Sequence, residues 1–221
     1  MSATWAILAA AGSGERLGAG HPKAFVRLGE LPMLAESLAR LDESGWVDAI
    51  VVAAPPGWEE PSILLAEELG AGKVSAVVPG GATRAESVRL ALAEVPADAV
   101  VVVVHDAARP LLDEAVLERV LGRLSEGWDG VVPALVIPDT VKRVDGDRVA
   151  ETLDRAALVA AQTPQAFLAD KLRAAFVDGA EASDCAALVE AAGGRVTWVE
   201  GDPRLLKITS QADLELVTSW L

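Results

Sequence analysis

Residues 5–17 read WAILAAAGSGERL, and this stretch decides the kind of fold that the chain can adopt. Its apolar part, residues 5–10, predicts a buried strand that ends in small side chains. Gly12 and Gly14 then permit a tight turn whose backbone N–H groups can point at phosphate oxygens. A first strand that runs into such a turn is common in α/β folds, where the turn faces a ligand crevice.

Short apolar runs alternate with amphipathic segments along the rest of the chain. This order predicts an α/β fold with βαβ units, a mostly parallel sheet and helices on both faces. No repeat or linker divides the sequence, so residues 1–221 are expected to form a single domain. Ligands in such sheets lie at the carboxyl ends of the strands, here the loops after Ala10, Val78 and Val104. The further strands are predicted at residues 49–53, 74–78, 99–104, 131–134 and 196–200, and the helices at residues 33–41, 61–69, 85–93, 114–124 and 211–221.

Composition limits the classes of partner. The chain of 221 residues carries a net charge of −14. Proteins that bind nucleic acids or anionic membranes neutralise phosphates with a broad basic face, so neither partner is expected. A polyanionic ligand must instead be balanced by a small cluster of cations and a metal ion. The single cysteine, Cys185, excludes an internal disulfide, and the N-terminus lacks a signal-peptide pattern, so a cytoplasmic location is expected.

One segment breaks the alternation of strands and helices. Residues 140–144 and 148–152 alternate in polarity around Asp145-Gly146-Asp147, which predicts a β-hairpin. A hairpin arm of about residues 138–156 has few large apolar side chains, and an isolated two-stranded hairpin is marginal in water. It should therefore pack on another surface. A second subunit and its own domain are both open at this point.

The loop after the first strand carries the strongest chemical signal. Arg16 and Lys23 place positive charge beside the turn. The glycine spacing is one residue too long for the dinucleotide fingerprint, and the lysine is misplaced for a P-loop. A glycine turn alone is often purely structural. The two cations on the same connection favour phosphate binding.

His105 and Asp106 follow five consecutive valines at the end of a buried strand. A carboxylate there is costly unless it is paired or binds a metal. Because Mg²⁺ prefers one or two carboxylates together with substrate phosphates, Asp106 is the candidate magnesium ligand. A salt bridge to Arg109 is the alternative. The neighbouring His105 is expected to be a hydrogen-bonded structural residue, and Lys207 is expected at a late strand end near the same crevice.

The loop at residues 80–87 provides a third polar strand end. Thr83 and Glu86 form the pattern of a capping box at the start of a helix. The loop can read the edge of a nucleobase, or it can be an ordinary capped helix. Asp113 and Ser210 are the expected caps of two later helices.

Seven blocks, in order, resemble the 2-C-methyl-D-erythritol 4-phosphate cytidylyltransferases of the non-mevalonate isoprenoid pathway. The resemblance covers essentially the whole chain. It implies a Rossmann-like nucleotidyltransferase domain, CTP, Mg²⁺ and a homodimer whose arm reaches the partner's active site. The blocks are AAGSGERL with PK (10–17 and 22–23), GGATRAES (80–87), HDAARP (105–110), DTVK (139–142), TLDR (152–155), TPQ (163–165) and KIT (207–209).

The resemblance also implies roles for individual residues. The cytidine would be surrounded by Ala10, Ala11, Gly12, Gly81, Ala82 and Ser87, with Gly14 in the same nucleotide-binding loop. The phosphates would contact Arg16, Lys23 and Lys207, and Asp106 would bind magnesium. The sugar phosphate would contact Arg109 and Thr163, together with Thr140 and Arg155 from the other subunit.

Two positions depart from the family pattern. Ala82 stands where relatives can carry an acidic side chain, so base recognition there must use the backbone. Ser183-Asp184-Cys185 replaces a typical Thr-Asp-Glu, which leaves the role of Ser183 open and predicts that Cys185 is inert.

The implied reaction transfers CMP from CTP to 2-C-methyl-D-erythritol 4-phosphate and releases pyrophosphate. The nucleophile is a phosphate oxygen that is largely ionised near neutral pH, because the second pKa of a phosphate monoester is about 6. No general base is needed, and the sequence contains no convincing catalytic triad. The main alternative is a cytidylyltransferase for another polyol phosphate such as ribitol 5-phosphate. A sugar-nucleotide pyrophosphorylase is a more distant alternative, and the glycine spacing argues against an NAD-dependent oxidoreductase.

Overall fold

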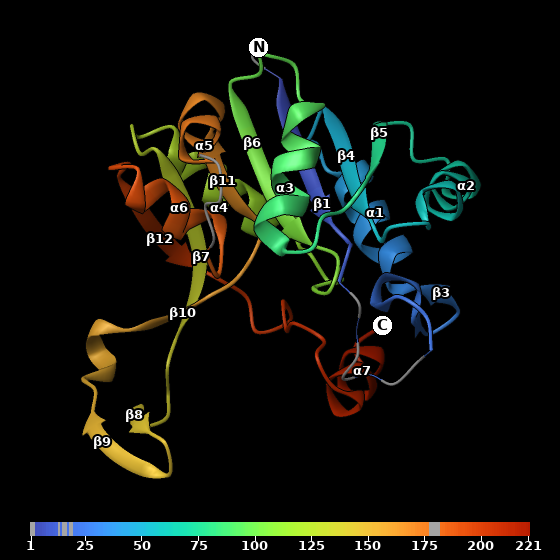
Figure 1. Cartoon of the computed structure of the whole chain (residues 1–221). Coiled ribbons are helices and arrows are strands. Elements are labelled where there is room, and N and C mark those ends of the chain that lie inside the picture. Colours follow the sequence, from blue (N-terminus) through green and yellow to red (C-terminus); the bar gives the residue numbers. More distant parts are fainter. Residues whose placement is uncertain (1–2, 13, 15–16, 18–19, 177–181) are drawn as a thin grey trace.

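The computed structural model describes residues 3–12, 14, 17, 20–176 and 182–221. An eight-stranded sheet runs through the molecule in the order β10-β7-β11-β6-β1-β4-β5, and β12 also pairs with β7. Four neighbouring strands are parallel (Figure 1). They are β1 (Thr4–Ala9), β4 (Ala49–Ala54), β5 (Val74–Pro79) and β6 (Val101–Asp106). The predicted mostly parallel sheet is confirmed.

The other half of the sheet is mixed. β7 (Gly130–Val136) and β12 (Val196–Glu200) pair in parallel. Both were predicted as strands. β10 (Val159–Ala161) and β11 (Gln165–Leu168) are antiparallel to β7, and β11 is also antiparallel to β6. Neither was predicted, because each is too short to show a period. β11 is held instead by tertiary packing, with Phe167 fully buried between its neighbours.

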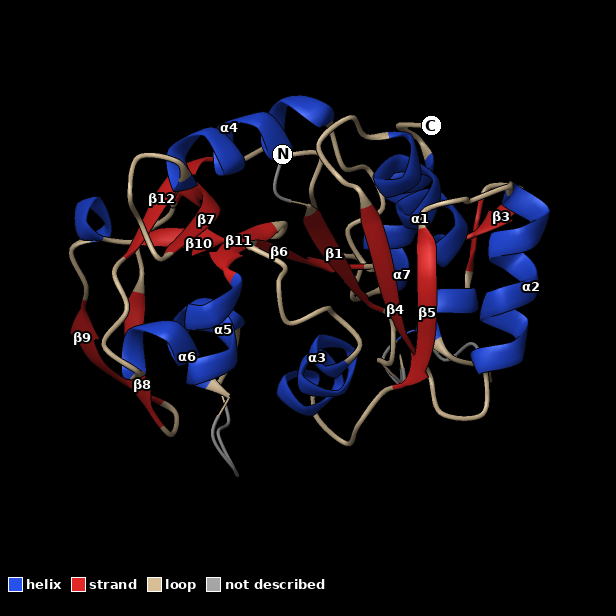
Figure 2. Ribbon diagram, turned by 90° about the horizontal axis from the view of Figure 1, so that it is seen from above, coloured by secondary structure: helices blue, strands red, loops and turns tan. Residues whose placement is uncertain are grey.

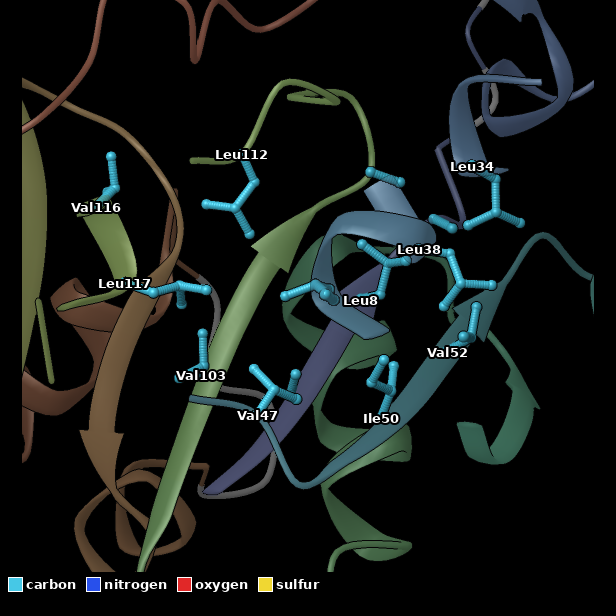
Figure 3. Packing of buried hydrophobic residues seen from close by; sticks show 14 of the residues in the cluster. Leu8, Leu34, Leu38, Val47, Ile50, Val52, Val103, Leu112, Val116 and Leu117 are labelled. Carbon is cyan, nitrogen blue, oxygen red and sulfur yellow. The ribbon is translucent and has the colours of Figure 1, made fainter. Parts of the chain in front are cut away.

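Helices cover both faces of the sheet, as predicted (Figure 2). One face packs against α1 (Met33–Glu43), α2 (Glu59–Leu69) and α4 (Glu114–Leu124). The other packs against α3 (Arg84–Ala93), α5 (Ala169–Ala175) and α6 (Cys185–Ala191). Figure 3 shows the first core, where Leu34 and Leu38 of α1 and Leu117 of α4 meet Leu8, Val52 and Val103 of the strands.

The chain end forms a smaller unit beside this sandwich. α7 (Gln211–Thr218) begins at Ser210, whose side chain and Asp213 form a capping box. Val217 of α7 and Ile208 are fully buried in a small core with Met33. The short elements η2 (Lys23–Phe25), β2 (Arg27–Leu28) and β3 (Leu31–Pro32) connect β1 to α1. The predicted caps Thr83 and Asp113 also accept backbone N–H groups at the starts of α3 and α4.

The hairpin arm is observed as predicted and stands away from the sheet (Figure 1). β8 (Lys142–Asp145) and β9 (Arg148–Thr152) form a separate two-stranded sheet, and η3 (Arg155–Ala157) follows. Every residue of β8 and β9 is exposed. The possibility that the hairpin lies on its own domain is therefore wrong.

The strand order places a ligand crevice at one edge of the sheet. From β1 the chain crosses to β4 on one side, whereas β6 lies on the other side of β1. The loops after β1 and β6 therefore diverge at their carboxyl ends, and ligands bind at such a point in open α/β sheets. Within the described ranges, every helix is too short or too polar to cross a lipid bilayer.

Candidate active site

A pocket of about 470 Å³ lies where the loops after β1, β5 and β6 meet. The β1 loop contributes Ala10, Ala11 and Gly12, and the β5 loop contributes Gly81, Ala82 and Ser87. These six are the residues expected around cytidine, and the fold brings them together. Cations from three parts of the chain line the same pocket: Lys23, Arg84 and Lys207. This is the local positive cluster that an acidic protein needs for a polyanionic ligand.

The walls of this pocket depend on the close approach of two loops. A Cβ atom added at Gly80 would lie 2.1 Å from the Cβ of Ala11, so a larger residue would force the β1 and β5 loops apart. The hydroxyl of Ser87 accepts the N–H of Gly81 at 3.1 Å and donates to the carbonyl of Thr83 at 2.8 Å. Ser87 therefore holds the loop in shape.

The backbone donors of the β5 loop are engaged by the helix that follows it. Glu86 Oε2 accepts the N–H of Ala82 at 2.7 Å, while Ser87 takes that of Gly81. The α3 helix thus fixes the loop through its own first turn. The N–H groups of Gly81 and Ala82 are thus both paired within the chain.

Gly14 has a different place from the one expected. It does not line the pocket, and its φ of +71° lies in the left-handed region that favours glycine. A Cβ atom there would lie 2.6 Å from the Cβ of Lys23. Gly14 therefore lets the loop pass against Lys23, whereas Lys23 itself reaches the pocket. The predicted phosphate ligand Arg16 lies outside the described residues.

Asp106 is held by two cations at the carboxyl end of β6. Arg84 Nε donates to its Oδ1 at 2.8 Å, and Lys207 Nζ donates to its Oδ2 at 2.7 Å. The side chain of Asp106 is 9% exposed, against 22% for Arg84 and 41% for Lys207. The carboxylate is thus buried beneath two cations that reach toward the pocket. The alternative salt bridge from Asp106 to Arg109 is wrong.

Charge pairing sets the protonation states of this cluster. Burial alone would raise the pKa of Asp106, but the charges of Arg84 and Lys207 outweigh it and hold that pKa well below its usual range. Burial would lower the pKa of Arg84, and the Asp106 charge is the main cause that raises it instead. Asp106 and Arg84 are therefore both charged at neutral pH. The cluster thus places two basic side chains, Arg84 and Lys207, against one carboxylate.

A second, smaller pocket of about 170 Å³ adjoins the first. It shares Arg84, Asp106 and Lys207 with the larger pocket, so these three side chains form a common wall. Arg109 adds another cation, whose Nη1 donates to the carbonyl of Leu205 at 2.6 Å. Burial lowers the pKa of Arg109. The remaining lining comes from Ala161, Gln162, Thr163, Gln165, Ser183 and Asp184.

Thr163 and His105 connect strand β6 to the segment before β11, beside the second pocket. The N–H of Asp106 donates to Thr163 Oγ1 at 3.0 Å, and Thr163 Oγ1 lies 3.1 Å from His105 Nδ1. Burial lowers the pKa of His105 to about 4, so the ring is neutral. Its Nε2 lies 3.0 Å from the carbonyl of Arg109, which can only accept, so Nε2 carries the proton. His105 is thus the hydrogen-bonded histidine that the sequence suggested.

The fold gathers most of the predicted site residues but not those of the arm. Asp106, Lys207, Arg109 and Thr163 line the smaller pocket. Thr140 and Arg155 lie on the arm and line neither pocket of their own chain. Lys207 lies near the crevice as expected, but in an irregular segment between β12 and α7 rather than at a strand end.

Arg84 is the residue that sequence reasoning missed. It was seen only as a member of the capped loop at residues 80–87. Its partner Asp106 lies 22 residues away in sequence. A signal was available, because Arg84 opens the helix after a strand whose carboxyl end lies at the crevice.

The chemistry of the site's acidic side chains decides whether it suits magnesium. Among the described residues, no group of three or more histidine, cysteine or acidic side chains is placed to hold a metal. Asp106 fits the narrower requirement of Mg²⁺, which takes one or two carboxylates and completes its shell with phosphate oxygens and water. A carboxylate has about four lone-pair sites, so the bonds from Arg84 and Lys207 leave acceptor capacity. Asp106 thus suits a metal that arrives with a phosphorylated substrate.

Comparison with known proteins decides the family. The model of the 2-C-methyl-D-erythritol 4-phosphate cytidylyltransferase family matches residues 4–221. This chain belongs to that family. Curated cytidylyltransferases of this name from Nocardia farcinica and Saccharopolyspora erythraea are 48% and 46% identical to the chain. The two alignments cover 98% of this chain, with 93% of the first relative and 98% of the second.

Solved structures of the family share the fold. The 2-C-methyl-D-erythritol 4-phosphate cytidylyltransferase of Thermus thermophilus is 33% identical, with a TM-score of 0.80 over 100% of this chain and 98% of that one. The 4-diphosphocytidyl-2C-methyl-D-erythritol synthase of Anaerococcus prevotii is 26% identical, with a TM-score of 0.84 over 99% and 98%. The Rossmann-like fold inferred from the resemblance is confirmed. The protein is a cytidylyltransferase that transfers CMP from CTP to 2-C-methyl-D-erythritol 4-phosphate, and the ribitol phosphate alternative is not favoured.

Proposed function

We propose that the larger pocket binds CTP and that the smaller pocket binds 2-C-methyl-D-erythritol 4-phosphate. The observation that supports this assignment is the common wall of Arg84, Asp106 and Lys207 between the two pockets. A transfer between two phosphorylated substrates needs cations where their phosphates meet, because two polyanions repel each other. The common wall provides them at that point.

The larger pocket suits a nucleoside triphosphate. Small residues on the β1 and β5 loops leave room for the base and ribose, and Ala82 reads the base through its backbone. Lys23 and Lys207 line the same pocket, where they would contact the phosphates. Arg16 is proposed as a further phosphate ligand on the same loop. Gly14 contributes by letting that loop pack against Lys23.

The smaller pocket suits the acceptor. Arg109 and Lys207 bind its phosphate, and Thr163 lies at the base of the same pocket. The acceptor phosphate then lies beside the α-phosphate of CTP across the common wall. An oxygen of the acceptor phosphate forms the new bond to the α-phosphorus, and the bond from that phosphorus to the β-phosphate oxygen breaks. Pyrophosphate leaves with the electron pair, so no proton transfer is required.

The residues around the reacting phosphates are proposed to act by positioning and by charge. Lys23, Arg16 and Lys207 neutralise the charge that builds on the transferred phosphoryl group and on pyrophosphate. Arg84 keeps Asp106 ionised and fixes its orientation. When Mg²⁺ binds Asp106 and the substrate phosphates, it supplies further positive charge at the reacting centre. The neutral His105 anchors Thr163 and the backbone of Arg109.

The arm is proposed to complete the acceptor site of a second copy of the chain. Exposed valines on both arm strands, Val144 and Val149, are 64% and 56% exposed, which suits burial against a partner. Thr140 and Arg155 would then contact the sugar phosphate of that partner. Residues 1–221 would act as one nucleotidyltransferase domain of a cytoplasmic homodimer.

The assignment is tested by measuring pyrophosphate release. CTP, UTP, ATP and GTP are each offered with 2-C-methyl-D-erythritol 4-phosphate and with ribitol 5-phosphate. The pair of CTP and the methylerythritol phosphate should react fastest.

Lys23→Ala and Arg16→Ala should each lower kcat by about 10²- to 10³-fold while the fold stays intact. Near-normal turnover in both variants would contradict the assignment of the phosphate site.

A further inference from the structure

Gln165 is a buried amide at the wall of the smaller pocket. It is 1% exposed and begins β11, where it pairs with Val104 of β6. The position of its backbone is therefore set by the central sheet. The mechanism proposed above gives this residue no role.

Neighbouring groups fix which way the amide of Gln165 points. Its Nε2 donates to Asp184 Oδ2 at 2.7 Å and lies 3.4 Å from the carbonyl oxygen of Gln162. Both partners can only accept, so the amide nitrogen must face them. Asp184 is fixed in turn, because its Oδ1 accepts the N–H of Ala187 at 2.9 Å as the cap of α6. A flipped amide would place its oxygen against this carboxylate.

The other end of the amide is left with no donor. Gln165 Oε1 is buried and has no hydrogen-bond partner among the residues that the structure describes. The same holds for Arg84 Nη2 and Arg109 Nε, and all three residues line the smaller pocket. Buried polar groups are nearly always hydrogen-bonded, so three residues with such atoms around one pocket indicate a ligand site. Two of the atoms are cationic donors, which suit a phosphate, and the third is a neutral acceptor, which suits a hydroxyl.

Gln162 provides a contrast on the same wall. It is 5% exposed, and both ends of its amide are satisfied by the backbone of Asp202. Its Nε2 donates to the carbonyl of Asp202 at 2.9 Å, and its Oε1 accepts the N–H of Asp202 at 3.0 Å. Gln162 therefore has a structural partner for each polar atom. Among the described residues, Gln165 has hydrogen-bond partners for its amide nitrogen but none for its amide oxygen.

We propose that Gln165 determines acceptor specificity by accepting, through Oε1, a hydrogen bond from one hydroxyl of the polyol chain. The inference rests on the proposed placement of the acceptor in the smaller pocket. A phosphate ester that lacks this hydroxyl leaves Oε1 buried and unpaired, so it is rejected. The adjoining cations bind any phosphate, whereas Gln165 distinguishes a polyol phosphate from a less hydroxylated one.

The test compares acceptors that differ by one hydroxyl. The kcat/KM of the wild type is measured with 2-C-methyl-D-erythritol 4-phosphate and with three analogues that have hydrogen in place of the hydroxyl at C1, C2 or C3. One analogue should lose about 100-fold in kcat/KM, since a site built to bind a hydroxyl strongly rejects the compound without it. In Gln165→Met, which preserves the side-chain length, that ratio should fall to about 3-fold or less. The KM for CTP should be unchanged.

Two further variants separate specificity from structure. Gln162→Met should lower kcat/KM for all acceptors in the same proportion and keep the discrimination. Asp184→Asn keeps a good helix cap but lets the Gln165 amide turn, so the discrimination should weaken even if Gln165→Met does not fold. Equal use of all three analogues by the wild type overturns the inference, and so does full discrimination in Gln165→Met. A wild type that transfers no CMP to the natural acceptor would instead contradict the proposed function.

Discussion

The Asp106 cluster and the hairpin arm use the same kind of interaction in opposite surroundings. Arg84 and Asp106 pair at 2.8 Å with side chains that are 22% and 9% exposed. On the arm, Arg143 and Glu151 pair at 3.0 Å with side chains that are 65% and 56% exposed. The first pair is fixed by helix α3 and strand β6 of one chain. The second is surrounded by solvent and by other exposed arm residues.

This difference separates what one chain can organise from what it cannot. The cluster is shaped before any substrate arrives, because loops, caps and a buried strand hold each group. On the arm, Thr140 and Arg155 line neither pocket of their own chain, and Arg155 Nη1 donates to the carbonyl of Pro138 within the arm itself. A single chain therefore presents a nearly formed centre, and its arm is proposed to require a partner chain.

The largest effect is expected from the centre of the cluster. Asp106→Asn removes the charge that pairs Arg84 and Lys207 and the candidate ligand for magnesium. Turnover should fall by about 10²- to 10³-fold, the loss typical of removing one electrostatic contact to a transition state. Pyrophosphate release at saturating substrates measures it, with circular dichroism as the check on folding. A folded variant within a few-fold of wild-type kcat would show that the carboxylate has no role in the reaction.

The thiol beside the cluster provides the next test. Cys185 is 1% exposed and accepts a hydrogen bond from Arg84 Nη1 at 3.5 Å. Burial raises the pKa of Cys185 to about 11, although the charge of Arg84 opposes this. Because the thiolate is the reactive form, the native protein at pH 8 should react with a thiol reagent at least about 100-fold more slowly than the denatured chain.

The time course of thiol labelling, with and without denaturant, checks this prediction. The reaction should speed up as the pH rises toward 11, since the folded state loses its proton only there. Rapid labelling at pH 8 would mean that the site around Arg84 opens readily.

The two ion pairs can be compared directly through stability. Arg84→Met leaves Asp106 buried with Lys207 alone and should lower the free energy of unfolding by about 3 kcal/mol, since removing one partner of a buried pair is destabilising. Arg143→Met, the matched change on the arm, should alter it by about 0.5 kcal/mol or less, as for exposed pairs generally. Urea unfolding of both variants measures the difference. Equal losses would show that burial does not distinguish the two regions.

Local patterns in the sequence were sufficient to predict much of the fold and part of the site. Five valines followed by His105 and Asp106 predicted a buried strand with a carboxylate at the crevice, and both are observed. The turn at Gly146 predicted the hairpin. Such features depend on neighbouring residues, so a single sequence reveals them.

Features that depend on the order of the strands were missed. Arg84 meets Asp106 because α3 packs beside β1 and β4, next to β6, and the sequence gives no direct sign of this neighbourhood. The nearer Arg109 was the natural candidate, but it turns toward the carbonyl of Leu205. β11 was missed for the same reason, because burial between two other strands, rather than its own pattern, makes it a strand.

The most direct test of the account asks whether a site combines the core of one chain with the arm of another. Mixed dimers of Asp106→Asn and Arg155→Ala chains, each with its own affinity tag, are purified through both tags. Pyrophosphate release is assayed at an acceptor concentration where Arg155→Ala alone is nearly inactive. A matched mixed dimer of Asp106→Asn and Lys207→Ala, which damages the core of both chains, serves as the control.

In the first mixed dimer, one of the two sites has an intact core and receives an intact arm. It should therefore recover about half of the wild-type activity, while the control stays inactive. Activity no higher than the mean of the two parent variants would show that the arm serves its own chain, and would contradict the account.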